Sequence, residues 1–167
     1  CCIGHITRDK IITPNQSISM SGGTAFYMAY GINNLPHDIA FQLVTKVGPE
    51  SYEEVDRMRQ AGIDVVCYDS AKSVYFENRY GIDSNQRTQR VLAKADPFTI
   101  EEVVPLEAKV FHLGSLLADD FPVEVVKALA EKGRISIDVQ GYLREVRGEK
   151  VYAVKWKAME EILAYTD

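Results

Sequence analysis

Apolar runs that suit buried strands alternate with helical patterns along most of this 167-residue chain, and this alternation constrains the fold more than any other feature. Buried strands are expected at 1–4, 39–44, 65–68, 110–113 and 135–138, and helices over 22–33, 50–60, 123–132 and 157–165. Parallel strands need a crossover connection, and strands covered on both faces form continuous apolar runs. The alternation therefore predicts an α/β protein with a doubly wound, mostly parallel sheet flanked by helices.

Four segments break this rhythm because polar and apolar residues alternate along them: 10–13, 17–20, 73–80 and 87–93. Alternation is typical of half-exposed antiparallel strands, so these segments are expected to form a small antiparallel sheet apart from the main one. On 73–80, one face carries Ser73, Tyr75, Glu77 and Arg79, and the other carries Val74, Phe76, Asn78 and Tyr80. The second face is richer in apolar residues and is the better candidate to cover a ligand. Val74 and Phe76 are then expected to be exposed when the site is empty.

Composition argues against several classes of protein. The chain is 46% hydrophobic and 26% charged with a net charge of −5, and no basic block suited to nucleic acid is present. No apolar run approaches the roughly 18–20 residues that cross a bilayer, and no signal-peptide pattern is visible. Three cysteines without CxxC spacing indicate a reducing, cytoplasmic compartment. His5, His37 and His112 lack the spacing of a metal site, so no metal ligand is predicted.

Two short motifs near the start of the chain suit a ligand site. Asp9 is expected just past the carboxyl end of the first strand, and the pair Gly22-Gly23 is expected to open a helix. In open α/β sheets, ligands bind outside the carboxyl ends of strands, and glycine lets the backbone approach a ligand closely. A turn acid and an ordinary helix-start turn are the alternatives.

A third motif follows the strand predicted at 135–138. Asp138, Gln140 and Arg144 place an acid, an amide and a guanidinium at the carboxyl end of that strand. Such a set can bind hydroxyl groups and phosphate together, although a loop salt bridge is the alternative. No P-loop of the form GxxxxGK[ST] occurs.

Together these motifs resemble the first half of the ribokinase-like (PfkB-type) sugar and nucleoside kinases. The chain departs from the family pattern at several positions. Thr7 stands where the family has an Asn two residues before its Asp, and Tyr27 stands where many sugar-specific members have an Asn. Tyr27 is then either a buried helix aromatic or a residue that changes the pocket. Gln140 replaces another Asn and Arg144 lies two residues late, a variant more similar to inositol-kinase-like members.

The resemblance implies a single, incomplete ribokinase-like domain over 1–167, with lid strands within 10–20 and 73–93. It implies transfer of phosphate from ATP, with Mg²⁺, to a hydroxyl of a sugar, polyol or nucleoside, and it allows a homodimer through the lid. The substrate-binding residues implied or suggested are Asp9, Gly22, Gly23, Tyr27, Tyr75, Phe76, Asn78, Gln140 and Arg144.

The family's N-x-x-E and G-A-G-D motifs do not occur in the 167 residues. Catalytic residues are therefore expected beyond Asp167, and the chain alone is expected to be inactive. A small-molecule-binding or interaction module without kinase activity is the alternative.

Overall fold

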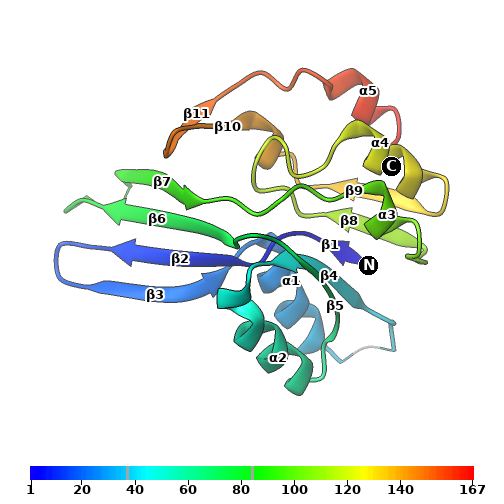
Figure 1. Cartoon of the computed structure of the whole chain (residues 1–167), viewed down its shortest axis with the longest axis horizontal. Helices are drawn as coiled ribbons and strands as arrows, with labels where there is room; N and C mark the ends of the chain where they lie inside the picture. The colour runs from blue at the N-terminus through cyan, green and yellow to red at the C-terminus, as the bar shows by residue number, and fades with distance from the viewer. Residues whose placement is uncertain (37, 84) are drawn as a thin grey trace.

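The computed structural model describes residues 1–36, 38–83 and 85–167 and arranges them around two β-sheets (Figure 1). The five-stranded sheet is parallel throughout, in the order β5 (Asp64–Asp69), β4 (Gln42–Val47), β1 (Cys2–Ile3), β8 (Val110–Leu113) and β9 (Arg134–Ile137). The six-stranded sheet has the order β10 (Arg144–Arg147), β11 (Lys150–Ala153), β7 (Arg87–Ala93), β6 (Val74–Tyr80), β2 (Thr7–Ile12) and β3 (Ser17–Gly22).

Helices cover both faces of the five-stranded sheet (Figure 1). On one face, α1 (Thr24–Asn33) and α2 (Tyr52–Gln60), which follows the short 3₁₀ turn η1 (Pro49–Ser51), pack in a cluster with Cys2 and Leu43. On the other face, α3 (Ile100–Val103), α4 (Val123–Ala130) and α5 (Met159–Leu163) pack in a cluster with Ile3 and Val44. Because neighbouring residues of a strand point to opposite faces, Cys2 and Leu43 serve one helix layer, and Ile3 and Val44 serve the other. The doubly wound prediction is confirmed.

The strand predicted at 39–44 lies further along the chain, at Gln42–Val47. Ile39 is 73% exposed, whereas Thr45 and Lys46 are buried despite their polarity. The Lys46 ammonium can be buried because it contacts the Glu102 carboxylate at 2.7 Å and donates to the carbonyl of Pro97 at 2.9 Å. These partners are distant in sequence, so the apolar pattern alone ends the strand too early.

All four alternating segments lie in the six-stranded sheet, extended by the β10–β11 hairpin around Gly148. The prediction of a purely antiparallel sheet is wrong, because β2 and β6 pair in parallel. Both strands leave the carboxyl ends of parallel strands, β1 and β5, so they enter the second sheet in the same direction. This sheet is therefore mixed. We call it the lid sheet.

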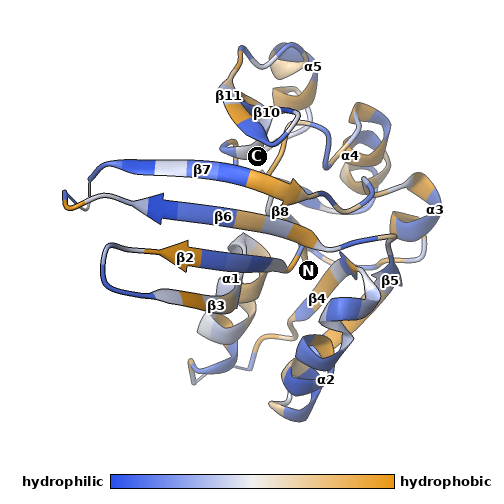
Figure 2. Ribbon diagram, turned by 60° about the vertical axis from the view of Figure 1, so that its left-hand side comes forward, coloured by the Kyte–Doolittle hydropathy of each residue, from blue (hydrophilic) through white to orange (hydrophobic). Residues whose placement is uncertain are grey.

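The expected exposure of Val74 and Phe76 is also wrong, since they are 0% and 5% exposed. Leu116 and Leu117, in the loop after β8, pack against them together with Val91. In Figure 2 the ends of β6 and β7 nearest the five-stranded sheet, which these leucines cover, are orange, and the far ends of both strands are blue. The exposed large apolar residues of the lid sheet include instead Ile18 (44%) and Met20 (41%) on the edge strand β3, and Tyr152 (40%) on β11.

A buried cluster of His5, Phe98 and Asp120, which we call the crossover cluster, joins the connections between the two sheets. The His5 ring stacks on Phe98 at 4.7 Å between centroids, and the Phe98 N–H donates to the carbonyl of Asp120 at 3.0 Å. The Asp120 carboxylate accepts from the N–H groups of Leu116 and Leu117 at 2.7 and 2.9 Å. Burial raises the pKa of Asp120.

We expect Asp120→Ala to destabilise the chain by about 2–4 kcal/mol, because two buried N–H groups would lose their acceptor. Asp119→Ala is the matched control: Asp119 is 55% exposed and contacts only the Lys94 ammonium among charged groups of the described residues. Asp119→Ala should lower the free energy of unfolding by less than about 1 kcal/mol. Urea unfolding of both variants measures the difference, and equal losses would show that Asp120 does not anchor the loop.

Candidate functional site

Strand register divides the lid sheet into two faces. Asp9 is paired with Phe76, Phe76 with Val91, and Asn78 with Gln89, so these residues share one face, which we call the inner face. Lys10, Glu77 and Arg90 share the opposite, outer face, where Glu77 contacts Lys10 at 3.4 Å and Arg90 at 3.3 Å. The outer face is therefore a network of ion pairs. The inner face is the one that the sequence analysis favoured for ligand.

Asp9 lies past the carboxyl end of β1, within strand β2, and not in a turn, which was the alternative. Its carboxylate accepts a hydrogen bond from the Thr7 hydroxyl at 2.8 Å. Burial raises the pKa of Asp9, while the Thr7 bond and the charge of Arg87 act in the opposite direction. Asp9 is thus a half-buried acid with room for further donors.

The absence of a side chain at Gly22 leaves space for the Asp9 carboxylate. A Cβ at Gly22 would lie 2.7 Å from Oδ2 of Asp9 and 3.1 Å from the Thr7 hydroxyl. Gly23 has φ +98°, and a Cβ there would lie 2.6 Å from the carbonyl oxygen of His5. Both positions of the diglycine therefore require glycine for steric reasons.

The residue after the diglycine is hydrogen-bonded to the Asp138 loop, the third motif of the sequence analysis. This residue, Thr24, donates from its hydroxyl to Oδ2 of Asp138 at 3.1 Å. The other oxygen of Asp138 accepts from the N–H of Gln140 at 2.9 Å. The start of α1 and the loop after β9 are therefore joined directly, although 114 residues separate them.

A cavity of about 650 Å³, which we call the inner-face cavity, lies between this loop and the lid sheet. Its polar lining comes from Arg87, Gln89, Asp138, Gln140 and Arg144, and its apolar lining from Val139, Leu143, Val151 and Ala153. Burial lowers the pKa of Arg144, and the charge of Arg87 lowers it further, while Asp138 acts in the opposite direction. Two guanidinium groups thus share one cavity, an arrangement that a phosphate or pyrophosphate anion would stabilise.

The structure brings together only some of the predicted site residues. Gln140 and Arg144 line the cavity, and Asn78 on the inner face accepts from the Gln89 amide at 2.9 Å. Tyr27 is 54% exposed on α1 and is not a buried helix aromatic. Tyr75 lies on the outer face beneath the guanidinium of Arg8, and Phe76 is buried against the loop after β8. Substrate binding by any of these residues remains a prediction.

Arg87, Gln89 and Thr24 are site residues that the sequence analysis did not select. Arg87 and Gln89 share the inner face with Val91, so the alternation of β7 contains the signal once the face of Val91 is known. Thr24 directly follows the diglycine, but its partner Asp138 could not be inferred from local pattern.

No metal site is evident within the described ranges. Those residues contain no group of three His, Cys, Asp or Glu side chains that could hold a metal ion. His112 bonds the Ser136 hydroxyl at 3.0 Å, as expected for a structural histidine, and His37 lies outside the described residues. No helix in the described part is long and apolar enough to cross a membrane.

No protein-family model matches the chain, and neither does any curated protein. A pyrophosphate-dependent kinase of the ribokinase family, solved with sulfate, is 28% identical over 99% of this chain with a TM-score of 0.89. A second structure of such a kinase, with a pyrophosphate analog and myo-inositol, is 27% identical over 99% of this chain with a TM-score of 0.88. The chain is a partial ribokinase-like protein.

The ribokinase-like chain spans less than two thirds of these relatives, 59% of the first and 58% of the second. The likeness extends more weakly to a nucleoside kinase of Methanocaldococcus jannaschii, which is 17% identical with a TM-score of 0.67 over 99% of this chain and 57% of that one. At that identity the likeness concerns the fold alone.

We expect Gly22→Ala to destabilise this ribokinase-like chain by about 1–2 kcal/mol, because the new methyl group would displace the Asp9 carboxylate from Thr7. Gly31→Ala is the control, since a Cβ there meets no atom within 4 Å. Gly31 lies within α1, so alanine should stabilise the chain by about 0.5–1 kcal/mol. Thermal unfolding measures both, and stabilisation by Gly22→Ala would contradict the proposed packing.

Proposed function

We propose that this chain is the acceptor-binding part of a ribokinase-like phosphotransferase that phosphorylates a hydroxyl group of a cyclic polyol. The observation that carries the proposal is the half-buried Asp9 carboxylate, held on the inner face by the Thr7 hydroxyl and by close packing against Gly22. A half-buried carboxylate that accepts hydrogen bonds from substrate hydroxyls orients the acceptor, and hydrogen bonds to a charged group are strong. In phosphoryl transfer, such positioning supplies much of the rate.

The lining of the cavity favours a polyol over a nucleoside. Amide and guanidinium groups of Gln89, Gln140 and Arg144 can bond several hydroxyls at once. No aromatic side chain is found among the described residues that line this cavity, so a nucleobase would have no ring on which to stack. The similar kinase solved with myo-inositol supports this acceptor class.

We further propose pyrophosphate as the phosphoryl donor, in place of the ATP expected from the sequence. Two similar structures, at 28% and 27% identity, are of pyrophosphate-dependent kinases. Arg87 and Arg144 would stabilise the donor's negative charge at the edge of the cavity. Mg²⁺ remains an expectation from the family. The groups that activate the acceptor hydroxyl and complete the donor site are expected outside these 167 residues.

The first test is binding of myo-inositol to the purified chain by calorimetry. Asp9→Ala should weaken binding by about 1.5–3 kcal/mol, or roughly 10–150-fold, because a charged acceptor is lost. Asp56→Ala, in an exposed ion pair with Arg59 on α2, is the control and should bind as the parent does. Equal affinity of the parent and Asp9→Ala would mean that Asp9 does not contact the acceptor.

The raised pKa of Asp9 adds a pH dependence to the same measurement. Only the carboxylate accepts hydrogen bonds at both oxygens, so affinity is full at neutral pH and falls as protonation begins. Because burial raises this pKa above the ordinary value of 3.8, affinity should fall at a higher pH than for an exposed aspartate. A loss confined to pH values below 3.8 would contradict this placement.

The second test concerns catalysis. The 167-residue chain should transfer no phosphate to myo-inositol from either pyrophosphate or ATP, because catalytic groups act as a unit and part of that unit is expected elsewhere. Phosphate release and inositol phosphate formation can be followed by ³¹P NMR. Turnover by the chain alone would show that its own residues complete the active site.

A further inference from the structure

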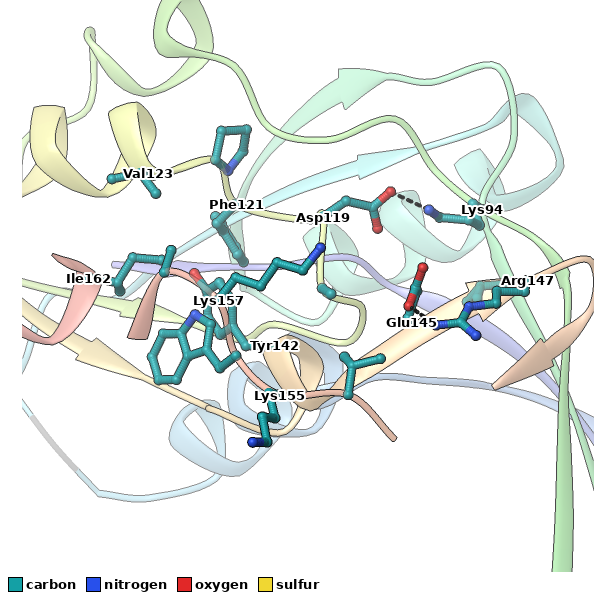
Figure 3. A pocket seen from close by; sticks show the side chains of 16 residues that line it. Lys94, Asp119, Phe121, Val123, Tyr142, Glu145, Arg147, Lys155, Lys157 and Ile162 are labelled. Atoms are coloured by element: carbon teal, nitrogen blue, oxygen red, sulfur yellow. Dashed lines mark hydrogen bonds and ion pairs between the residues drawn. The ribbon is translucent and has the colours of Figure 1, made fainter. Parts of the chain in front are cut away.

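A second cavity, of about 900 Å³, lies on the other side of strand β10 from the inner-face cavity. It is bounded by the β10–β11 hairpin, the start of α4 and α5, and Figure 3 shows the side chains of Lys94, Lys155 and Lys157 around it. None of the residues that line this hairpin pocket also lines the inner-face cavity. It is therefore a separate space, and the proposed phosphotransfer does not use it.

The hairpin pocket carries a surplus of positive charge. Its two carboxylates are already paired, Asp119 with Lys94 and Glu145 with Arg147. Lys155 and Lys157 also line it, and neither makes an ion pair within the described ranges. The chain as a whole has a net charge of −5, so this surplus runs against its overall charge.

The hairpin pocket also has more hydrogen-bond donors than acceptors. Tyr142 and Trp156 stack at 4.5 Å between centroids and an interplanar angle of 20°. The Tyr142 hydroxyl and the Trp156 indole N–H are both buried and have no partner among the described residues. Buried polar groups are normally bonded, so two unpaired donors beside unpaired cations indicate that an acceptor is missing.

The rest of the hairpin pocket is lined by apolar side chains and by the N-terminus of helix α4. Phe121, Val123 and Ile162 supply apolar surface. Val123 is also the first residue of the eight-residue helix α4, whose N-terminal N–H groups and dipole favour an anion. An occupant would thus meet cations and donors at one side and apolar or aromatic surface at the other.

We propose that the hairpin pocket binds a small amphipathic anion, a carboxylate, sulfonate or phosphate carried on an apolar or aromatic body. The anionic group would lie near the Lys157 ammonium and the unpaired donors of Tyr142 and Trp156, and the body would lie against the apolar wall. The occupant would contact Glu145, the next residue along β10 after Arg144, which lines the inner-face cavity.

Anilinonaphthalene sulfonate is the test probe, and phenyl-naphthylamine, which has the same rings without the anion, is its neutral control. Trp156 is the single tryptophan of the chain, so quenching of its emission with energy transfer to the probe reports occupancy of this pocket. We expect the sulfonate to bind at least about tenfold more tightly than the amine at low salt, with the preference shrinking as salt is added. Equal affinities for both probes would overturn the proposal.

Charge reversal locates the site. Lys157→Glu should weaken sulfonate binding about tenfold, and Lys157→Gln should weaken it less. Lys109→Glu, an equal charge change at an exposed lysine outside the pocket, should leave it unchanged. Circular dichroism of each variant checks the fold.

Equal loss in Lys157→Glu and Lys109→Glu would overturn the proposal, as would displacement of the probe by saturating myo-inositol. Since neither result bears on Asp9, this proposal and the phosphotransfer proposal can fail independently.

Discussion

The crossover cluster is the interaction on which the rest of the structure depends. His5 follows β1 and Phe98 follows β7, so two connections between the sheets meet at one buried point with Asp120, which lies in the loop after β8. Burying a carboxylate destabilises the fold unless the carboxylate is hydrogen-bonded, and the Asp120 carboxylate accepts hydrogen bonds from the N–H groups of Leu116 and Leu117. In return, those leucines cover the base of the lid sheet.

The packing of Leu116 and Leu117 covers only the half of the inner face that lies nearest the five-stranded sheet, and it leaves the far half uncovered. The apolar residues of β6 and β7 nearest the five-stranded sheet are buried in the core. The polar pairs further along these strands, such as Asn78 with Gln89, therefore remain on the side of the inner-face cavity. The diglycine then brings the Asp9 carboxylate and the Asp138 loop to the same region. The site is polar because the residues that could have made it apolar already belong to the core.

The sequence alone predicted the layers of this fold, since continuous apolar runs and alternating runs differ plainly. Val110–Leu113 and 87–93 have the predicted bounds. It could not predict that β2 pairs in parallel with β6, because pairing direction depends on where each strand leaves the main sheet. It also missed α3, whose four residues are too short for a helical period.

Within the site, the sequence predicted the residue types better than their surroundings. Asp9, Gly22, Gln140 and Arg144 were found from local motifs; Gln140 and Arg144 line the inner-face cavity, and Asp9 packs against Gly22 on the inner face of the lid sheet. The second strand was expected to begin at Lys10, because Thr7-Arg8-Asp9 carries no apolar alternation; pairing with two neighbouring strands extends it back to Thr7, so that it includes Asp9. The burial of Phe76 depends on leucines 40 residues away, which no local pattern reveals.

The parallel pairing of β2 with β6 has a mechanical consequence. A lid made of one hairpin could swing open on two backbone hinges. Here β2, β3, β6 and β7 each connect to the body of the protein, and all four connections would have to bend together. The lid sheet should therefore rock as a stiff plate, a shear-like motion of small amplitude, and not open as a flap.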